Sequence, residues 1–264
     1  SLKNEYLANI QKLREKYAKQ IIIESGYEVE YLPGEEASLL ELKKETDKIL
    51  LGQHFLYDRN KNLKIFGSKN KFTKEELKEY VNYIEEAVKL RIPSLIAHPD
   101  IYMLGRDSFG KTESEIAHRI CEIAEKYSVP LEINLNKIFS DTYYKDKKLI
   151  DDSIQVQRKR IIDIAYPCKE FWEVVANYNV KVLYGIDVHH KGQISLFNNL
   201  VTLANEIIGK NTINKLNFIT NDEVLLESIP FLKECSSVTQ DLRGHSSALR
   251  YVCVKDGITY FVKI

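Results

Sequence analysis

The sequence predicts an α/β protein built from parallel strands, each followed by a helix. Short apolar runs, typical of buried strands, recur along the chain, and each ends in polar residues. Segments with helical periodicity and capping residues separate these runs. The chain has 264 residues, which is long for one ordinary domain but normal for a single α/β barrel.

The expected helices and strands alternate along most of the chain. Thr73 with Glu76, and Thr112 with Glu115, match the capping box that opens a helix. The expected helices lie at 3–18, 35–47, from 73, from 112, around 171–175 and at 194–209. The expected strands lie within 26–32, 49–55, 94–97, 130–136 and 182–188, and 56–71 and 137–165 are expected to be polar connections.

Composition narrows the class of protein. Lys+Arg and Asp+Glu both number 38, so no nucleic-acid or membrane surface driven by bulk charge is expected. The four cysteines form no CxxC pair and fit free thiols in a reducing compartment. No apolar run reaches membrane-spanning length and no signal peptide is expected, so the sequence predicts a cytoplasmic protein; its oligomeric state stays open.

The apolar run at 182–186 ends in Asp187, His189 and His190. In an extended chain Asp187 and His189 point the same way, so both can reach one divalent metal. The alternative interpretation is an aspartate that caps the next helix, followed by two solvated histidines. This segment alone does not decide between them.

Equivalent positions after the earlier strands favour a metal site. Glu28, His54 and His98 each follow one strand, and Asn134 or Asn136 follows another. In a parallel barrel the carboxyl ends of the strands converge on one rim. The sequence therefore predicts a metal site made by Glu28, His54, His98, Asp187 and His189. Histidines with carboxylates suit zinc, manganese or iron, and Glu28 could bridge two metals.

These segments resemble, in the same order, the motifs of the PHP (polymerase and histidinol phosphatase) family, most closely its histidinol-phosphatase-like branch. The resemblance covers about residues 4–220, and the matching segments are GYEVEYLPG (26–34), GQHF (52–55), AHPD (97–100), LEIN (131–134) and GIDVH (185–189). It implies a PHP-type distorted (β/α) barrel with several divalent metal ions at its carboxyl rim.

The resemblance also implies roles for individual residues. Glu28 corresponds to the bridging carboxylate, and His54 and His98 to ligands from the next two strands. Asp187 and His189 correspond to the pair from the last strand, with a catalytic as well as a ligating role. The implied reaction is hydrolysis of a small phosphomonoester, in which metal ions activate water and stabilise the charge on the phosphoryl oxygens.

The sequence departs from the family pattern at one point. The family opens with a His-x-His strand and a second strand ending in histidine, and this sequence contains neither. We therefore expect a barrel that is incomplete at its N-terminus, with strand edges that need a cover. The alternative function is that of a degenerate, catalytically weak barrel that serves as a binding or regulatory module, or a fragment of a larger multidomain protein.

The remaining segments are less specific. Arg158 and Arg160, in the insertion, are the candidates for binding a substrate phosphate. We expect residues 1–220 to form the barrel portion and 221–264 a C-terminal helix and β-hairpin appendage, because two alternating runs meet at Asp256-Gly257. This hairpin also resembles the first hairpin of aminoglycoside-phosphotransferase-like kinases, with Lys263 at the phosphate-contacting position, but a small appendage covering the barrel is the preferred interpretation.

Overall fold

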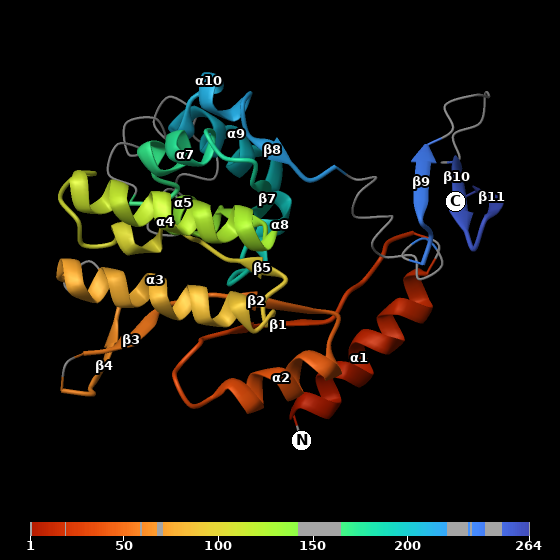
Figure 1. The fold of residues 1–264 in the computed structure, drawn as a ribbon, viewed down its shortest axis with the longest axis horizontal. Coiled ribbons are helices and arrows are strands. Elements are labelled where there is room, and N and C mark those ends of the chain that lie inside the picture. Colours follow the sequence, from red (N-terminus) through yellow and green to blue (C-terminus); the bar gives the residue numbers. More distant parts are fainter. Residues whose placement is uncertain are drawn as a thin grey trace. The chain divides into compact units, whose positions relative to one another are not determined.

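The computed structural model describes residues 2–18, 20–58, 60–67, 71–141, 165–220, 232, 234–240 and 250–263. The chain divides into two compact units, Ser1–Phe218 and Ile219–Ile264. The first unit holds an α/β arrangement with a parallel sheet, as the sequence predicts (Figure 1). That residues 1–220 and 221–264 are two independent domains, as the sequence suggests, stays a prediction.

The first unit is organised around one sheet of six parallel strands. Their order in the sheet is the order in the sequence, and the strands are β1 (Gly26–Val29), β2 (Lys48–Leu51), β5 (Leu95–Ile96), β6 (Leu131–Asn134), β7 (Lys181–Gly185) and β8 (Asn217–Phe218). A sequential order without reversal is typical of (β/α) barrels rather than of doubly wound sheets. Among the described strands β1 and β8 are the edges.

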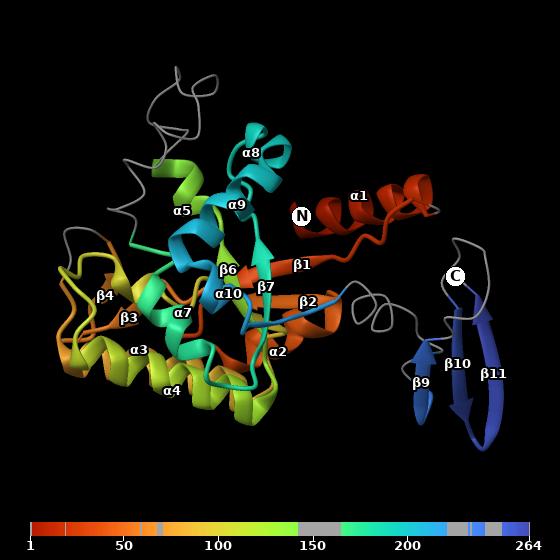
Figure 2. The same ribbon diagram turned by 90° about the horizontal axis from the view of Figure 1, so that it is seen from above.

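Helices connect successive strands of the sheet, and one more helix precedes the first strand. They are α1 (Leu2–Tyr17), α2 (Glu36–Glu45), α3 (Lys74–Lys89), α4 (Lys111–Tyr127), α5 (Asn136–Phe139), α7 (Lys169–Val175), α8 (Gly192–Ser195), α9 (Phe197–Ile208) and α10 (Lys210–Ile213), with a 3-10 turn at Ile101–Met103. Helices α3, α4 and α7 lie together along one face of the sheet (Figure 2). Among the described helices, none combines the length and apolar character needed to cross a membrane.

The core lies between the sheet and these three helices. Strand residues that face the helices, such as Ile49, Leu51 and Val182, are fully buried, and Phe171 and Trp172 of α7 pack against them as one cluster. Burial of each such side chain contributes about 1.5–3 kcal/mol. Residues that alternate with these along the strands, such as Leu50 and Leu183, are half-buried and point to the opposite face.

Three expectations about local structure need correction. The segment 56–71, expected to be a loop, contains the antiparallel hairpin β3 (Phe55–Tyr57) and β4 (Leu63–Ile65). Helix α4 begins two residues earlier than the Thr112–Glu115 box implies: Gly110 is the N-cap, and the Glu113 carboxylate accepts its backbone N–H at 3.0 Å. Strand β8 was not expected. The Thr73–Glu76 capping box of α3 is confirmed.

The second unit contains a three-stranded antiparallel sheet. Strands β10 (Arg250–Lys255) and β11 (Ile258–Lys263) form the expected hairpin, and β9 (Ser237–Gln240) pairs with the other side of β10. Asp256 and Gly257 have φ of 51° and 76°, which suits the tight turn that joins two twisted strands. The C-terminal helix expected before this sheet falls largely outside the described residues.

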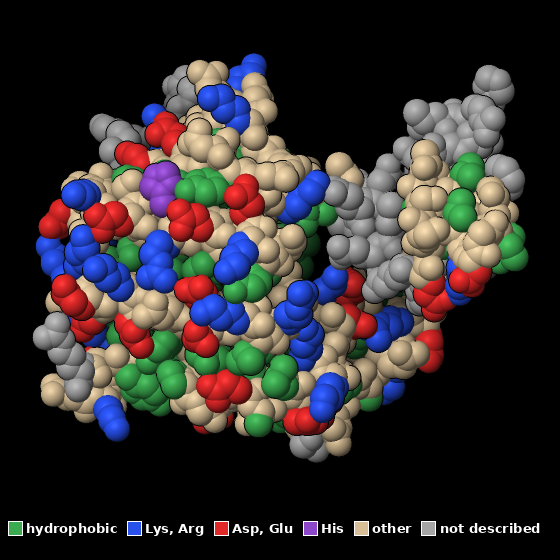
Figure 3. Space-filling model, in the orientation of Figure 1, with side chains coloured by type: hydrophobic (Ala, Val, Ile, Leu, Met, Phe, Trp, Pro, Cys, Tyr) green, Lys and Arg blue, Asp and Glu red, His purple; other side chains and the backbone are tan. Residues whose placement is uncertain are grey.

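The outer surface of the first unit is mixed in charge. Figure 3 shows acidic and basic side chains interspersed over the face formed by α3 and α4, and salt bridges such as Lys74–Glu115 and Arg119–Glu85 lie there. This pattern agrees with the equal numbers of acidic and basic residues in the sequence.

Candidate metal centre

Three predicted ligands come together at the carboxyl ends of β1, β2 and β5. Glu28 lies in β1, His54 follows β2 and His98 follows β5, and each offers one ligand atom within 4.8 Å of the other two. The cause is topological, because neighbouring parallel strands end at the same edge of the sheet. We call Glu28, Glu30, His54 and His98 the imidazole half of the site.

The contact between Glu28 and His98 is direct. Nε2 of His98 lies 3.0 Å from Oε1 of Glu28, and His98 is only 2% exposed. The hydrogen bond from His98 holds the pKa of the Glu28 carboxyl below its usual value, although partial burial opposes this shift. The carboxylate therefore carries its charge at neutral pH, which is the form that binds a metal.

His54 is oriented by a second carboxylate. Its Nδ1 lies 2.6 Å from Oε1 of Glu30, and Oε2 of Glu30 accepts the backbone N–H groups of His54 and Phe55 at 2.7 and 3.2 Å. Burial acts to lower the pKa of His54, but the hydrogen bond and charge of Glu30 outweigh it and raise that pKa. A carboxylate that holds one ring nitrogen leaves the other free to ligate, as is usual around metal-binding histidines.

These three donors fit a divalent metal. The His54 and His98 rings have centroids 4.4 Å apart, and the donor set of two imidazoles and one carboxylate is one that zinc accepts. Metal–ligand bonds of ~2.0–2.2 Å in a tetrahedron place neighbouring ligand atoms roughly 3.3 Å apart. The 3.0 Å between His98 and Glu28 is close to that spacing. Manganese and iron accept the same donors.

A buried carboxylate links this group to the next strand. Oε2 of Glu132, on β6, accepts the backbone N–H of His98 at 2.9 Å and the side-chain amide of Asn134 at 3.0 Å. Burial raises the pKa of the Glu132 carboxyl above its usual value. Two glycines leave room for these acids, since a Cβ on Gly185 would overlap Glu132 and a Cβ on Gly52 would overlap Glu28.

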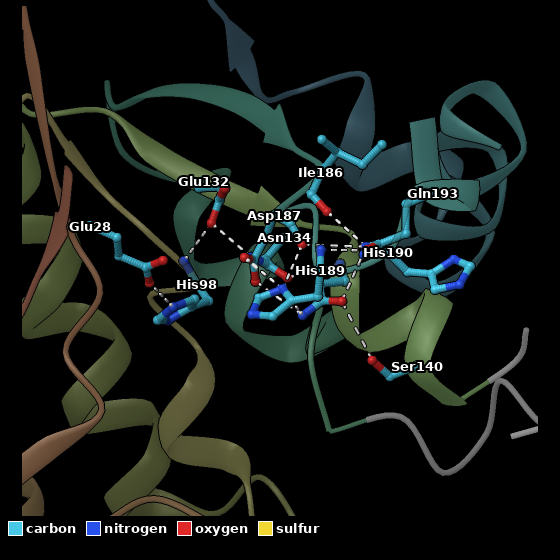
Figure 4. Close-up of polar contacts among 11 residues, drawn as sticks. Glu28, His98, Glu132, Asn134, Ser140, Ile186, Asp187, His189, His190 and Gln193 are labelled. Carbon is cyan, nitrogen blue, oxygen red and sulfur yellow. Dashed lines mark hydrogen bonds and ion pairs between the residues drawn. The ribbon is translucent and has the colours of Figure 1, made fainter. Parts of the chain in front are cut away.

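Asp187 and His189 lie on the far side of this link and are held by amides (Figure 4). Oδ2 of Asp187 accepts hydrogen bonds from Nδ2 of Asn134 at 3.3 Å and of Asn136 at 3.1 Å. Nδ1 of His189 lies 3.2 Å from Oδ1 of Asp187. We call Asn134, Asn136, Asp187, His189 and Gln193 the amide-held half of the site.

The reason for the proximity of Asp187 and His189 differs from the expected one. Strand β7 ends at Gly185, and Asp187 has φ of 44°, so the segment is a left-handed turn rather than extended chain. His98 has φ of 30°. Within the part of the chain that the structure describes, the other non-glycine residues with positive φ lie in turns or at helix ends, namely Lys61, Arg91, Ser128 and Asp256. Strained backbone at strand ends typically marks functional positions.

A cavity of about 240 Å³ lies beside these residues. Glu28, Glu132 and Asp187 line its polar end, and its remaining wall is made by Leu50, Leu95, Ala97, Asn134, Leu183, Gly185 and Ile186. Both halves of the site therefore border the same space.

Asp100 supports the loop that carries His98. It is fully buried, and its Oδ2 accepts the Cys168 backbone N–H at 2.7 Å and the Trp172 indole N–H at 3.0 Å. Burial raises the pKa of this carboxyl to about 7, in spite of these hydrogen bonds. The residue ties the His98 loop to α7.

The structure brings together Glu28, His54 and His98 as one cluster and places Asp187 and His189 beside it. Arg158 and Arg160 lie outside the described residues. The supporting residues Glu30, Glu132 and Gln193 were not assigned from the sequence. Glu30 could have been, because it stands two residues after Glu28 and so points to the same side of an extended chain.

No protein-family model matches the sequence, and no curated protein gives a significant match. Solved structures do resemble the fold. A candidate histidinol phosphatase, hisK, from Listeria monocytogenes aligns with a TM-score of 0.54 and 19% sequence identity over 72% of each chain. Histidinol phosphate phosphatase from Lactococcus lactis, solved with zinc, L-histidinol and phosphate, gives a TM-score of 0.49 and 16% identity over 76% of this chain and 73% of that one. The fold of this chain is therefore similar to that of the Listeria histidinol-phosphatase-like protein.

Proposed function

We propose that this chain is a metal-dependent phosphoesterase of the PHP type that hydrolyses a small phosphomonoester, and that its sheet is part of a PHP-type barrel. One observation carries the proposal: Glu28, His54 and His98 present three ligand atoms within 4.8 Å at the ends of neighbouring parallel strands. The motif resemblance and the fold similarity to a histidinol-phosphatase-like protein support it.

The described residues have separate tasks in this proposal. Glu28, His54 and His98 would hold the first divalent ion, and Asp187 with His189 would complete the site from the other side. A bound ion would supply Lewis acidity toward the phosphoryl oxygens and lower the pKa of a water ligand. Glu30 fixes the orientation of His54, and Glu132 fixes the backbone of His98. Arg158 and Arg160 remain candidates for binding the phosphate.

The test is phosphate release from histidinol phosphate and from an aryl phosphate, with manganese or zinc added. We expect slow hydrolysis by this chain that is lost with a chelator and in His98→Ala. His118→Ala is the matched control, because His118 is an exposed histidine on α4 whose Nδ1 lies 2.7 Å from the Tyr178 hydroxyl, and it is not one of the predicted ligands. Release that continues unchanged in His98→Ala would contradict the proposal.

The absent His-x-His motif favours one alternative, a catalytically weak module that binds rather than hydrolyses. This alternative predicts metal-dependent binding of phosphate, measured by calorimetry, without phosphate release under any metal. Turnover by a version of the chain extended at its N-terminus, but not by this one, would assign the missing step to residues outside this sequence.

A further inference from the structure

Gln193 is a fully buried amide at the start of the short helix α8, directly after the segment that carries Asp187 and His189. A buried amide side chain needs partners for two donor hydrogens and one acceptor oxygen. Gln193 is 0% exposed and finds all of them in this one segment and in Asn136.

The contacts of Gln193 are unusually complete. Its Oε1 accepts the backbone N–H groups of His189 and His190, both at 2.7 Å. Its Nε2 lies 3.2 Å from the carbonyl oxygen of Ile186, 3.3 Å from that of Asp187 and 3.1 Å from Oδ1 of Asn136. Gln193 therefore binds backbone groups on both sides of Asp187.

These contacts hold a strained turn in place. A non-glycine residue with φ of 44° costs on the order of 1–3 kcal/mol, and such a conformation persists only where its surroundings enforce it. Beyond Gly185 the chain has left the β-ladder, so these N–H and C=O groups lack strand partners. Gln193 supplies both the donor and the acceptor that they need.

Gln193 also sets the orientation of Asn136. Because Nε2 of Gln193 donates to Oδ1 of Asn136, Nδ2 of Asn136 must point the other way, where it donates to Oδ2 of Asp187. The ring of His189 is held nearby, with Nδ1 2.9 Å from the Asp187 carbonyl oxygen. When Nδ1 carries the proton in that contact, Nε2 is left free to ligate.

We infer that Gln193 is a positioning residue that orients Asp187 and His189 as metal ligands, without touching the metal itself. The claim that Gln193 orients metal ligands rests on the proposed function. The claim that it holds the turn rests on the geometry alone. It goes beyond the family motifs, because Gln193 lies outside all the matching segments. A leucine of similar size would lose every contact, whereas a glutamate would keep the acceptor and lose the donor.

The experiment compares Gln193→Leu and Gln193→Glu with Ser25→Ala in the full chain. Ser25 is a matched control because it is also buried and hydrogen-bonded, but to Asp47 beside the amino ends of the strands. Three quantities are measured: amide hydrogen exchange at residues 189 and 190 in chelator, the dissociation constant for cobalt(II) by visible absorption, and phosphate release.

In chelator, Gln193→Leu should speed exchange of the His189 and His190 amides, and Gln193→Glu should leave both protected. Both variants should weaken cobalt binding about 10–100-fold, the usual loss when an outer partner of a metal ligand is removed. In addition, kcat should fall more than KM rises. Ser25→Ala should change none of these quantities by more than about twofold, even if its midpoint of thermal unfolding drops.

Cobalt binding by Gln193→Leu and Gln193→Glu that equals binding by Ser25→Ala would overturn the metal role of Gln193. Unchanged amide exchange in Gln193→Leu would overturn the claim that Gln193 holds the turn. Failure of the unaltered chain to bind cobalt would instead contradict the proposed function. In that case faster exchange in Gln193→Leu would still support the positional role.

Discussion

The two halves of the site are built differently. In the imidazole half, acids and imidazoles contact one another directly, as in His98–Glu28 and His54–Glu30. In the amide-held half, Asp187 is bound by asparagine amides, and the His189 side chain is 69% exposed. Glu132 is the link, since it binds the backbone of His98 and the side chain of Asn134.

This difference indicates how each half would meet a metal. The imidazole half has three donor atoms within 4.8 Å of one another, on side chains that are held by direct contacts between acids and imidazoles. The amide-held half depends on a turn and on amide orientations, and the His189 side chain is largely exposed to solvent. We therefore expect both halves to contribute to metal affinity, and the amide-held half also to set the rate of catalysis.

The largest effect should come from Asp187→Asn. Asparagine tolerates the left-handed backbone and keeps the shape of the side chain, but it loses the negative charge. Phosphate release should fall on the order of 10²–10³-fold, the usual loss for one key electrostatic group, with the unfolding midpoint almost unchanged. Asp256→Asn makes the same replacement at φ of 51° in the hairpin turn and should have no effect on phosphate release. Equal activity of the two variants would remove Asp187 from the mechanism.

Gly185→Ala tests the link between the halves. A Cβ at this position would overlap the buried Glu132 carboxylate and push it away from His98 and Asn134. The free energy of unfolding, measured with urea, should fall by about 2–4 kcal/mol from overpacking and lost hydrogen bonds. Gly67→Ala is the control, because nothing lies within 4 Å of a Cβ there. If Gly185→Ala lost no more stability than Gly67→Ala, the Glu132 carboxylate would not be packed against Gly185 as described.

Asp100→Asn tests whether the buried carboxyl that ties the His98 loop to α7 makes stability depend on pH. Burial raises the folded-state pKa of this carboxyl to about 7, so between about pH 4 and 7 the folded chain keeps a proton that the unfolded chain releases. As the pH rises from about 4 to 7, the free energy of unfolding of the wild type should therefore fall by roughly 3–4 kcal/mol relative to that of the variant. Above pH 7 the difference between the two should be constant. The measurement is urea unfolding in chelator at several pH values. A variant curve parallel to that of the wild type would contradict the buried, protonated carboxyl.

The smallest effect concerns Glu30→Gln, which weakens the support of one ligand. The amide oxygen can still accept the backbone N–H groups, but the charge beside Nδ1 of His54 is lost. The pKa of His54, followed by NMR, should fall, and cobalt affinity should drop about tenfold. Glu24→Gln, which removes only a surface ion pair with Lys48 at 3.6 Å, should change neither. Unchanged cobalt binding in Glu30→Gln would show that His54 needs no such support.

The pattern of the sequence predicted the strands and the proximity of Glu28, His54 and His98 for a physical reason. Apolar runs must be buried, and parallel strands bring their carboxyl ends to one edge. Glu28, His54 and His98 therefore could be placed together without knowledge of their side-chain contacts. The alternation of helices and strands along the chain also predicted that the strands run parallel, as they do.

Other features depend on tertiary contacts that the pattern does not contain. Gly110, rather than Thr112, is the N-cap of α4. The reason is that Glu113 is buried against Arg106, and this contact fixes the first turn of the helix. The hairpin β3–β4 was missed because the residues around Asp58 and Asn62 resemble a polar loop, whereas their hydrogen bonds close a turn. Gln193 was missed because its partners are mostly backbone groups.

The central claim is that Glu28, His54 and His98 hold a metal ion, and X-ray absorption at the zinc edge tests it most directly. The zinc-loaded chain should show a first shell of nitrogen and oxygen near 2.0–2.1 Å, with the outer-shell scattering of imidazole. In His98→Ala the imidazole contribution should decrease, whereas in His118→Ala it should be unchanged. A shell that contains sulfur near 2.3 Å, or one whose imidazole contribution is identical in His98→Ala, would contradict the account.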